Sequence, residues 1–283
     1  MKAKRLHKGT PTLTSWIMTS LLCLGAIALP AAVAAQENAK SASKKSMTAK
    51  QIMDEMNAKN SALGVNSGEA RIELVIEDRT GTRRTRELVV RSKKIEEASR
   101  TLVRLTAPKE LDGQAFLFSE NKKAEDDVWM YLPAFKVSRR VEGSQKRGAF
   151  LGSHFSFSDL ESRDLKDGDY QRLDDEKIGK DEVFVISVKP KDASSSDYGK
   201  VVAYIRQSDY MPLKMKFYDR ESTDEAIKTL FVEKLSKDDA GNPYITQMTL
   251  RSKKGGYSTI VISDVDSKKE LPDTLFTRDQ LGK

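Results

Sequence analysis

The stretch ARIELVIE at residues 70–77 alternates apolar and polar side chains with the period of a β-strand. Alternate residues of a strand point to opposite faces, so the stretch has two unlike sides. One side carries Ala70, Ile72, Leu74 and Ile76, and the other carries Arg71, Glu73, Val75 and Glu77. This pattern predicts a half-buried strand whose apolar face packs against a core.

Similar stretches recur on both sides of this strand and are separated by short turns. Turn residues such as Asp167-Gly168-Asp169 and Gly255-Gly256 punctuate the chain, and no long helix intervenes. Strands joined in this way pair mainly antiparallel. The further strands are expected at about 84–92, 97–107, 114–120, 126–132, 169–176, 181–189, 199–207, 212–219, 226–236, 243–254 and 257–266.

About a dozen such strands predict a meandering sheet that curls strongly or closes. An outer-membrane barrel would need an unbroken apolar band facing lipid and a polar lumen. At 32% charged residues the chain instead has material for a water-facing exterior, so we expect the apolar face inside. A helix beginning at Thr48 and running to about Asn60 is expected to cap the sheet, because Ile52, Met53 and Met56 recur at helical spacing.

Residues 1–35 have the layout of a secretory signal peptide. Four basic residues come first, an apolar run from Ile17 to Leu29 follows, and small residues end the segment, so cleavage is expected after Ala34 or Ala35. An uncleaved signal anchor is the alternative. A lipid-modified Cys23 is disfavoured because bulky Leu22 precedes it. Residues 36–47 are small, polar and basic, and they predict a flexible tether before a single domain at 48–283.

Removal of the signal peptide changes the charge and leaves few reactive side chains. The net charge falls from +7 to +3, because 45 basic residues remain against 42 acidic ones. The mature chain has no cysteine and one histidine, His154. This composition excludes a disulfide framework and a cysteine-based zinc site. The weak positive charge and the export signal also argue against nucleic-acid binding.

Catalytic patterns are scarce in the mature chain. It has no Gly-x-Ser-x-Gly elbow and no phosphate-binding glycine motif. Ser153 and His154 are neighbours, which would point to opposite faces of a strand. Acidic pairs such as Asp264 and Asp266 are typical of solvated strand ends. We therefore expect no enzyme, no metal and no cofactor, with a hydrolase that uses paired carboxylates as the remaining catalytic alternative.

The segment at 144–162 departs from the strand pattern. Aromatic and aliphatic residues lie there among glycines and serines, and Ser156 or Ser158 is positioned to cap a short helix that includes Asp159. The basic residues just before and within it give the 136–147 loop a charge of +4. Two interpretations stay open: aromatic side chains that plug the core, or a functional lid over an apolar interior.

An apolar interior, a lid and no catalytic machinery together favour a carrier of apolar cargo. Each CH₂ group removed from water contributes about 0.8 kcal/mol, so an acyl chain of about sixteen carbons gains roughly 12 kcal/mol gross. A closed cavity lined by Leu, Ile, Met and Phe returns most of this free energy when the chain leaves a membrane.

The stretch from Val128 to Leu160 resembles a family of known fold. It contains Trp129-Met130-Tyr131-Leu132-Pro133-Ala134-Phe135, the pair Arg139-Arg140, Phe150-Leu151-Gly152-Ser153 and Phe155-Ser156-Phe157-Ser158-Asp159-Leu160. This block is similar to that of the outer-membrane lipoprotein-sorting proteins, the LolA/LolB-like superfamily. The specific resemblance is to an uncharacterised branch often associated with exporters of the resistance-nodulation-division class. With the closing Leu271-Pro272-Asp273, the resemblance covers about residues 48–280.

The resemblance implies a mainly β fold: an unclosed antiparallel β-barrel, or half-shell, with a few short helices as its lid. It implies a periplasmic carrier that holds acyl chains of lipoproteins or other lipids without a cofactor. Its partners would be an inner-membrane exporter of the resistance-nodulation-division or ABC type and an outer-membrane acceptor. The alternative is an envelope adaptor or sensor with the same shell that regulates a protein partner. The implied cavity and lid residues are Trp129, Tyr131, Leu132, Phe135, Phe150, Phe155, Phe157 and Leu160, and the implied head-group or partner rim is Arg139, Arg140, Lys146 and Arg147.

Overall fold

The computed structural model describes most of the chain after the expected tether. The described residues are 46–60, 68–121, 126–161, 168–191, 196, 198–238 and 241–283. The predicted signal peptide at 1–35 and nearly all of the predicted tether at 36–47 lie outside them. Met47–Lys283 forms one compact unit, and everything below concerns that unit.

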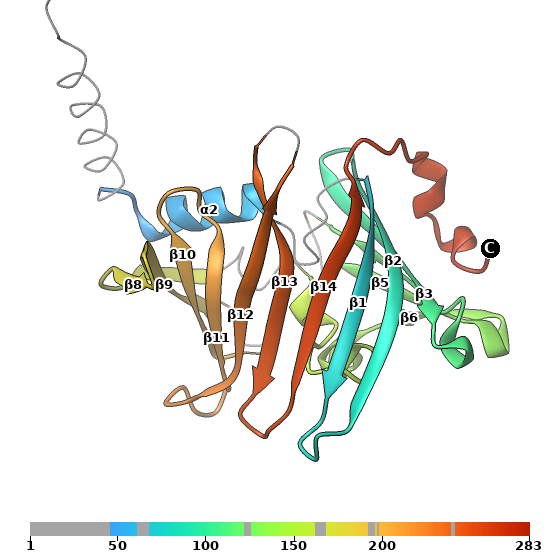
Figure 1. The fold of residues 1–283 in the computed structure, drawn as a ribbon, viewed down its shortest axis with the longest axis horizontal. Helices are drawn as coiled ribbons and strands as arrows, with labels where there is room; N and C mark the ends of the chain where they lie inside the picture. Colours follow the sequence, from blue (N-terminus) through green and yellow to red (C-terminus); the bar gives the residue numbers. More distant parts are fainter. Residues whose placement is uncertain are drawn as a thin grey trace, which may run out of the picture. The chain divides into compact units, whose positions relative to one another are not determined.

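A single 14-stranded sheet dominates this unit (Figure 1). All of its neighbouring strands pair antiparallel, in the order β6-β5-β4-β3-β2-β1-β14-β13-β12-β11-β10-β9-β7, with β8 also pairing β9. The edge strands β6 and β7 do not pair with each other, so the sheet is not closed, which confirms the predicted half-shell. The strands are β1 (Gly68–Glu77), β2 (Arg83–Ile95), β3 (Ala98–Ala107), β4 (Ala115–Ser119), β5 (Asp127–Leu132), β6 (Val137–Val141), β7 (Gly168–Arg172), β8 (Glu176–Ile178), β9 (Asp181–Pro190), β10 (Lys200–Arg206), β11 (Pro212–Tyr218), β12 (Ala226–Lys237), β13 (Pro243–Ser252) and β14 (Tyr257–Asp266).

Hydrophobic alternation located these strands because one face of most of them is buried. In β1 the side chains of Ala70, Ile72, Leu74 and Ile76 are buried, as the pattern predicts. Two strands were not predicted. Strand β6 is a short edge strand with mainly exposed residues, and β8 has three residues, so neither carries a long apolar stripe.

One α-helix of the described residues packs on the concave side of the sheet. Helix α2 (Ala49–Lys59) begins at Thr48, as predicted: the Thr48 hydroxyl accepts from the backbone N–H of Gln51 at 3.3 Å, and the Gln51 side chain accepts from the Thr48 backbone at 2.9 Å. This reciprocal pair is a capping box. Its buried face carries Ile52, Met53 and Met56, and the helix lies against β7 and β9.

Short 3₁₀ turns connect or follow the strands. They are η1 (Lys109–Leu111), η2 (Pro133–Phe135), η3 (Gly143–Arg147), η4 (Phe150–Gly152), η5 (Ser158–Leu160), η6 (Asp273–Phe276) and η7 (Arg278–Gln280). The turn η5 lies where the short helix was expected. The Ser156 hydroxyl accepts from the backbone N–H of Asp159 at 3.2 Å, although Phe157 occupies the N-cap position.

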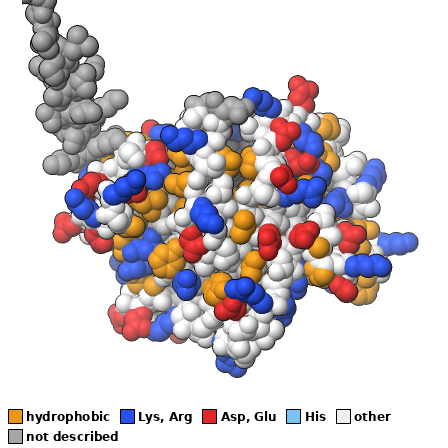
Figure 2. Space-filling model, viewed as in Figure 1, with side chains coloured by type: hydrophobic (Ala, Val, Ile, Leu, Met, Phe, Trp, Pro, Cys, Tyr) orange, Lys and Arg blue, Asp and Glu red, His pale blue; other side chains and the backbone are white. Residues whose placement is uncertain are grey.

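Apolar side chains are buried on both faces of the sheet. The largest cluster lies on the concave side and includes α2, the inward residues of the strands and the aromatic residues of 150–157. On the convex side, η6 and η7 cover Leu102, Ala115 and Leu117 of β3 and β4, and Leu281 is fully buried there. On the surface of the molecule, the face drawn in Figure 2 shows basic and acidic side chains mixed together. This agrees with the water-facing exterior expected from 32% charged residues.

Candidate functional site

The segment that links the two edge strands of the open sheet enters the concave core. It leaves β6, forms η3, η4 and η5, and is described as far as Glu161, before the chain returns in β7. A small loop orders it: the Phe150 N–H donates to the Phe155 carbonyl at 2.7 Å, and the Phe157 N–H donates to the Gly148 carbonyl at 3.3 Å. The rings of this loop therefore point toward the sheet instead of into solvent.

Three phenylalanine rings from two distant segments form the centre of this contact. The Phe116 ring of β4 lies 5.0 Å from that of Phe150 and 5.7 Å from that of Phe157. Phe150 and Phe157 are 5.5 Å apart and nearly perpendicular. Edge-to-face rings at such distances stabilise a core beyond their buried area. These side chains are packed core residues in the structure.

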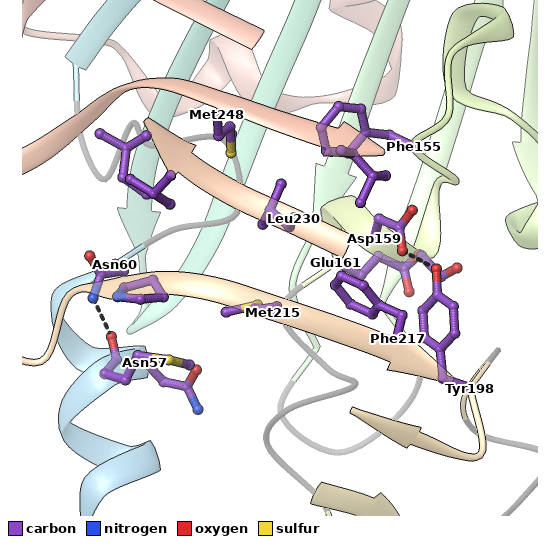
Figure 3. Close-up of a pocket in the computed structure, with 16 residues that line it drawn as sticks. Asn57, Asn60, Phe155, Asp159, Glu161, Tyr198, Met215, Phe217, Leu230 and Met248 are labelled. Atoms are coloured by element: carbon purple, nitrogen blue, oxygen red, sulfur yellow. Dashed lines mark hydrogen bonds between the residues drawn. The ribbon is translucent and has the colours of Figure 1, made fainter. Parts of the chain in front are cut away.

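Beside this aromatic core lies an elongated apolar cavity of about 120 Å³ (Figure 3). Helix α2 and the 155–161 segment form one wall, and the concave faces of β11, β12 and β13 form the other. Ten of the lining side chains are apolar: Met56, Phe155, Pro212, Met215, Phe217, Leu230, Val232, Ile245, Met248 and Leu250. The polar lining residues are Asn57, Asn60, Ser158, Asp159, Glu161 and Tyr198.

The polar residues gather at the two ends of the cavity. Figure 3 shows Asn57 and Asn60 at one end and Asp159, Glu161 and Tyr198 at the other, with Met215 and Leu230 between them. The Asn60 side-chain amide donates to the Met56 carbonyl at 2.8 Å, which closes the end of α2. The cavity thus has an apolar middle and two hydrogen-bonding ends.

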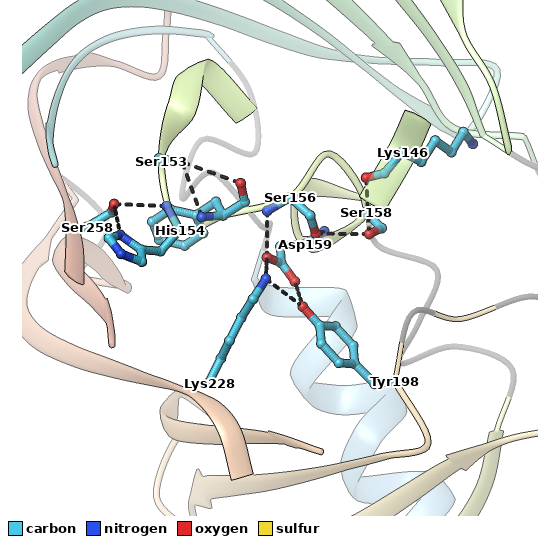
Figure 4. Close-up of polar contacts among 10 residues, drawn as sticks. Lys146, Ser153, His154, Ser156, Ser158, Asp159, Tyr198, Lys228 and Ser258 are labelled. Carbon is cyan, nitrogen blue, oxygen red and sulfur yellow. Dashed lines mark hydrogen bonds and ion pairs between the residues drawn. The ribbon is translucent and has the colours of Figure 1, made fainter. Parts of the chain in front are cut away.

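A buried ion-pair network supports the acidic end (Figure 4). Asp159 accepts from the hydroxyl of Tyr198, from the backbone N–H of Ser156 at 2.7 Å and from Lys228 Nζ at 3.1 Å. Lys228 Nζ also donates to the Tyr198 hydroxyl at 3.1 Å. The side chain of Asp159 is 5% exposed and that of Lys228 is 22% exposed. A buried carboxylate needs such partners, and here they join η5 to β12 and to Tyr198.

A second ion pair holds the neighbouring part of the segment. Lys146 Nζ lies 3.0 Å from a carboxylate oxygen of Glu161, and the two side chains are 12% and 8% exposed. Lys146 also donates to the backbone carbonyl of Asp126 at 2.6 Å. These contacts fix the 3₁₀ turn η3 to the end of the segment and to the start of β5.

His154 lies at the edge of this region and contacts β14. Its backbone N–H donates to the Ser258 hydroxyl at 3.0 Å, and its Nδ1 lies 2.8 Å from the same oxygen. Burial lowers the pKa of His154, and the nearby charge of Lys228 acts in the same direction. The ring thus joins the segment to the sheet. The serine that contacts this ring is Ser258 and not the adjacent Ser153.

The structure distributes the eight residues predicted for cavity and lid over several environments. Phe155 lines the cavity, while Phe150, Phe157 and Leu160 lie in the adjoining concave core. Trp129 and Tyr131 lie on the other side of β5, in the cluster under the C-terminal segment, where the Arg278 guanidinium is 4.9 Å from the Trp129 ring.

The last two of these residues lie at the β5–β6 connection. Leu132 ends β5 and is half-buried, and Phe135 in η2 is 71% exposed. Neither is among the residues that line the cavity.

The four basic residues predicted for a rim are also separated. Arg139 and Arg147 are exposed, and Lys146 is the buried partner of Glu161. Arg140 pairs with Asp127 and, at 2.9 Å, with Glu142. Hydrogen bonds to these two carboxylates raise its pKa. Their roles in head-group or partner binding stay predictions.

Most of the cavity was not foreseen as a site. The alternation in β11 and β13 does place Met215, Phe217 and Met248 on apolar faces, so a signal for the wall exists in the sequence. No comparable signal marks Tyr198 and Lys228, which meet Asp159 only through the fold.

No helix among the described residues is both long enough and apolar enough to span a bilayer. Within the same residues, no group of three or more His, Cys, Asp or Glu side chains is arranged to bind a metal ion.

Comparisons with known proteins add to this picture. A family model described as "Uncharacterized protein" matches residues 97–283. No curated protein matches the chain. A crystal structure of a domain from Vibrio parahaemolyticus, named as an outer-membrane lipoprotein-sorting protein, is 27% identical, with a TM-score of 0.74 over 83% of this chain and 98% of that one.

Two other solved structures share the fold. A DUF1329 family protein from Desulfovibrio piger is 24% identical, with a TM-score of 0.73 over 82% of this chain and 97% of that one. A LolA superfamily protein from Nitrosomonas europaea is also 24% identical, with a TM-score of 0.64 over 83% of this chain and 99% of that one.

Proposed function

The chain belongs to the family matched over residues 97–283 and, with it, to the LolA-like superfamily, and from this premise we propose that it is a periplasmic carrier of acyl chains. The carrier takes the acyl chains of lipoproteins or other lipids into the cavity and moves them toward the outer membrane. The observation that carries this proposal is the apolar cavity between α2, the 155–161 segment and the concave sheet.

The lining of the cavity suits an acyl chain. Met56, Met215 and Met248 lie on its walls, and methionine side chains adapt their shape to flexible apolar ligands. Hydrocarbon buried there leaves water with a gain of about 0.8 kcal/mol per CH₂. The apolar wall therefore binds an acyl tail through buried apolar surface and matching shape, and it makes no hydrogen bond along the length of the tail.

Loading requires the cavity to widen. At about 120 Å³ it is comparable to an engineered cavity of about 150 Å³ that accepts benzene, and a long acyl chain is much larger. The elements that can move are those that cover the sheet, since each strand is held to its neighbours by backbone hydrogen bonds. Helix α2 is the part that we expect to move, because it packs on β7 and β9 and belongs to no strand ladder.

An adaptor or sensor with the same shell is the second candidate. It would use the cavity only as a lipid cue and would bind one protein partner stably. The exposed Phe135 and the exposed Arg139 near the β6 edge favour this alternative, because they offer an aromatic and a cationic contact away from the cavity.

The test is to purify the mature protein from the periplasm without detergent and to record native mass spectra, followed by lipid extraction. The carrier predicts co-purifying acylated species near one per chain. If the spectra show only the mass of the protein without lipid, and this does not change after incubation with membrane vesicles, the carrier proposal is contradicted and the adaptor is favoured.

A matched pair of variants links binding to this cavity. Leu230→Trp places a large ring in the cavity and should abolish lipid retention. Phe231→Trp changes the next residue of β12, which points to the other face, and should leave retention unchanged. Both proteins must show the same far-UV spectrum and a cooperative melt, so that a loss of lipid reports on the cavity and not on unfolding.

A further inference from the structure

We propose that the cavity selects acyl ligands whose polar group is a hydrogen-bond donor without negative charge, such as the amide N–H of an N-acylated cargo, and discriminates against fatty-acid carboxylates. The inference rests on the proposed function and names the class of ligand that the same cavity takes. The observation that carries it is the polarity of the wall at the end formed by Asp159, Glu161 and Tyr198.

The ionisable groups on the cavity wall are acidic or neutral. Among the described lining residues, Asp159 and Glu161 are the charged ones, and no lysine, arginine or histidine lines the cavity. Both carboxylates are more than nine-tenths buried. A ligand that reaches this end therefore meets carboxylate and phenol oxygens in a poorly hydrated site.

The compensating cations lie behind these oxygens. Lys228 binds Asp159 from β12, and Lys146 binds Glu161 from η3, and neither lysine is part of the lining. Figure 4 shows Lys228 reaching Asp159 and the Tyr198 hydroxyl together. Each ion pair is thus oriented with its negative end toward the cavity. The network as a whole is balanced in charge, but the surface that a ligand contacts is an acceptor surface.

The acceptor surface has room for a donor. A carboxylate offers about four lone-pair positions, and Asp159 uses three of them for Tyr198, Ser156 and Lys228. An amide N–H, a hydroxyl or an ammonium group completes this set. A carboxylate or phosphate has no proton to donate to these oxygens and would face like charge that Lys228 and Lys146 offset only in part.

The opposite end of the cavity does not reverse this preference. Asn57 and Asn60 are neutral amides. The side-chain N–H groups of Asn60 donate hydrogen bonds to the backbone carbonyls of Met56 and Tyr210. Its remaining acceptor oxygen again suits a donor. Among the described lining residues, a ligand with a single anionic head finds no cation at either end.

The experiment compares three probes that share one tail and differ only in the head: hexadecanamide, hexadecylamine and hexadecanoate. Each displaces a fluorescent acyl probe from the mature, delipidated protein at pH 7.5. We expect hexadecanoate to bind at least about tenfold more weakly than the amide and the amine.

Variants assign the preference to the acidic end. Glu161→Gln and, separately, Asp159→Asn should each reduce the difference in affinity between hexadecanamide and hexadecanoate severalfold. The matched control Glu87→Gln changes an exposed carboxylate of β2 that does not line the cavity, and it should leave this difference unchanged. Because the two acidic-end variants are made separately, the test can still be carried out if one of them fails to fold.

The outcomes separate this inference from the proposed function. Equal affinities for the three probes, or a gap that survives both acidic-end variants, would overturn the inference while leaving the carrier intact. Failure of all three probes to bind would overturn the carrier itself.

Discussion

Replacing Phe150 by alanine removes a ring that packs against three others. Its centroid lies 5.0 Å from Phe116, 5.5 Å from Phe157 and 6.2 Å from Phe118, and its side chain is buried. A buried Phe→Ala change costs about 3–5 kcal/mol, and each aromatic pair adds about 0.5–1.5 kcal/mol beyond its area. The measured range of 3–5 kcal/mol already contains the loss of such ring pairs, so three of them place Phe150→Ala at its upper end, at about 4–5 kcal/mol in the free energy of unfolding.

This loss is large compared with the 5–15 kcal/mol typical of a folded domain. Urea unfolding followed by fluorescence measures it directly. With a slope of about 3 kcal/mol per molar, the midpoint should fall by about 1.5 M urea at an unchanged slope.

Phe135 provides the matched control. It is the same residue type, but its side chain is 71% exposed, so Phe135→Ala should change the stability by less than about 0.5 kcal/mol. If Phe150→Ala instead costs less than about 1 kcal/mol and abolishes acyl binding, the ring belongs to a movable lid, and its assignment to the core is wrong.

Three further predictions test other contacts. Lys228→Met leaves the buried Asp159 without its cation and should lower the free energy of unfolding by about 3 kcal/mol. Adding Asp159→Asn should restore more than half of this loss, which a double-mutant cycle of urea unfolding measures. Leu281→Ala, at a fully buried convex-face position, should cost about 3 kcal/mol but leave acyl affinity unchanged, and a loss of acyl binding would show that the two faces are coupled. Because burial lowers the pKa of His154, the folded state binds fewer protons than the unfolded state, so stability should fall as the pH drops below about 6.5. His154→Gln should reduce this slope between pH 7 and pH 5, and an unchanged slope would assign it to other groups.

The strands were predictable because their signal is local. In β1 the alternation of Ala70, Ile72, Leu74 and Ile76 with polar residues follows from strand geometry alone, and it holds wherever one face is buried. The cap at Thr48 is local for the same reason, since its partner Gln51 is three residues away. Strand β6 escaped prediction because an exposed edge strand needs no apolar stripe.

The alternation of apolar and polar residues within a strand could not show which residues face the inside of the shell and which face the outside. Trp129 and Tyr131 share one face of β5, but both faces of this part of the sheet are covered. The C-terminal segment, more than a hundred residues later, packs over their side. A pattern within one strand cannot show which covering segment it will meet.

The sequence by itself therefore determined the strand alternation, the capped helix and the apolar character of the 150–160 segment, because each depends on neighbours within a few residues. Only the tertiary structure decided that Phe155 lines a cavity while Phe150 packs behind it. It alone also brought Lys228 to Asp159, 69 positions away. Such contacts depend on how the sheet curves and which segments fill its open side, and that is the result of packing the whole chain at once.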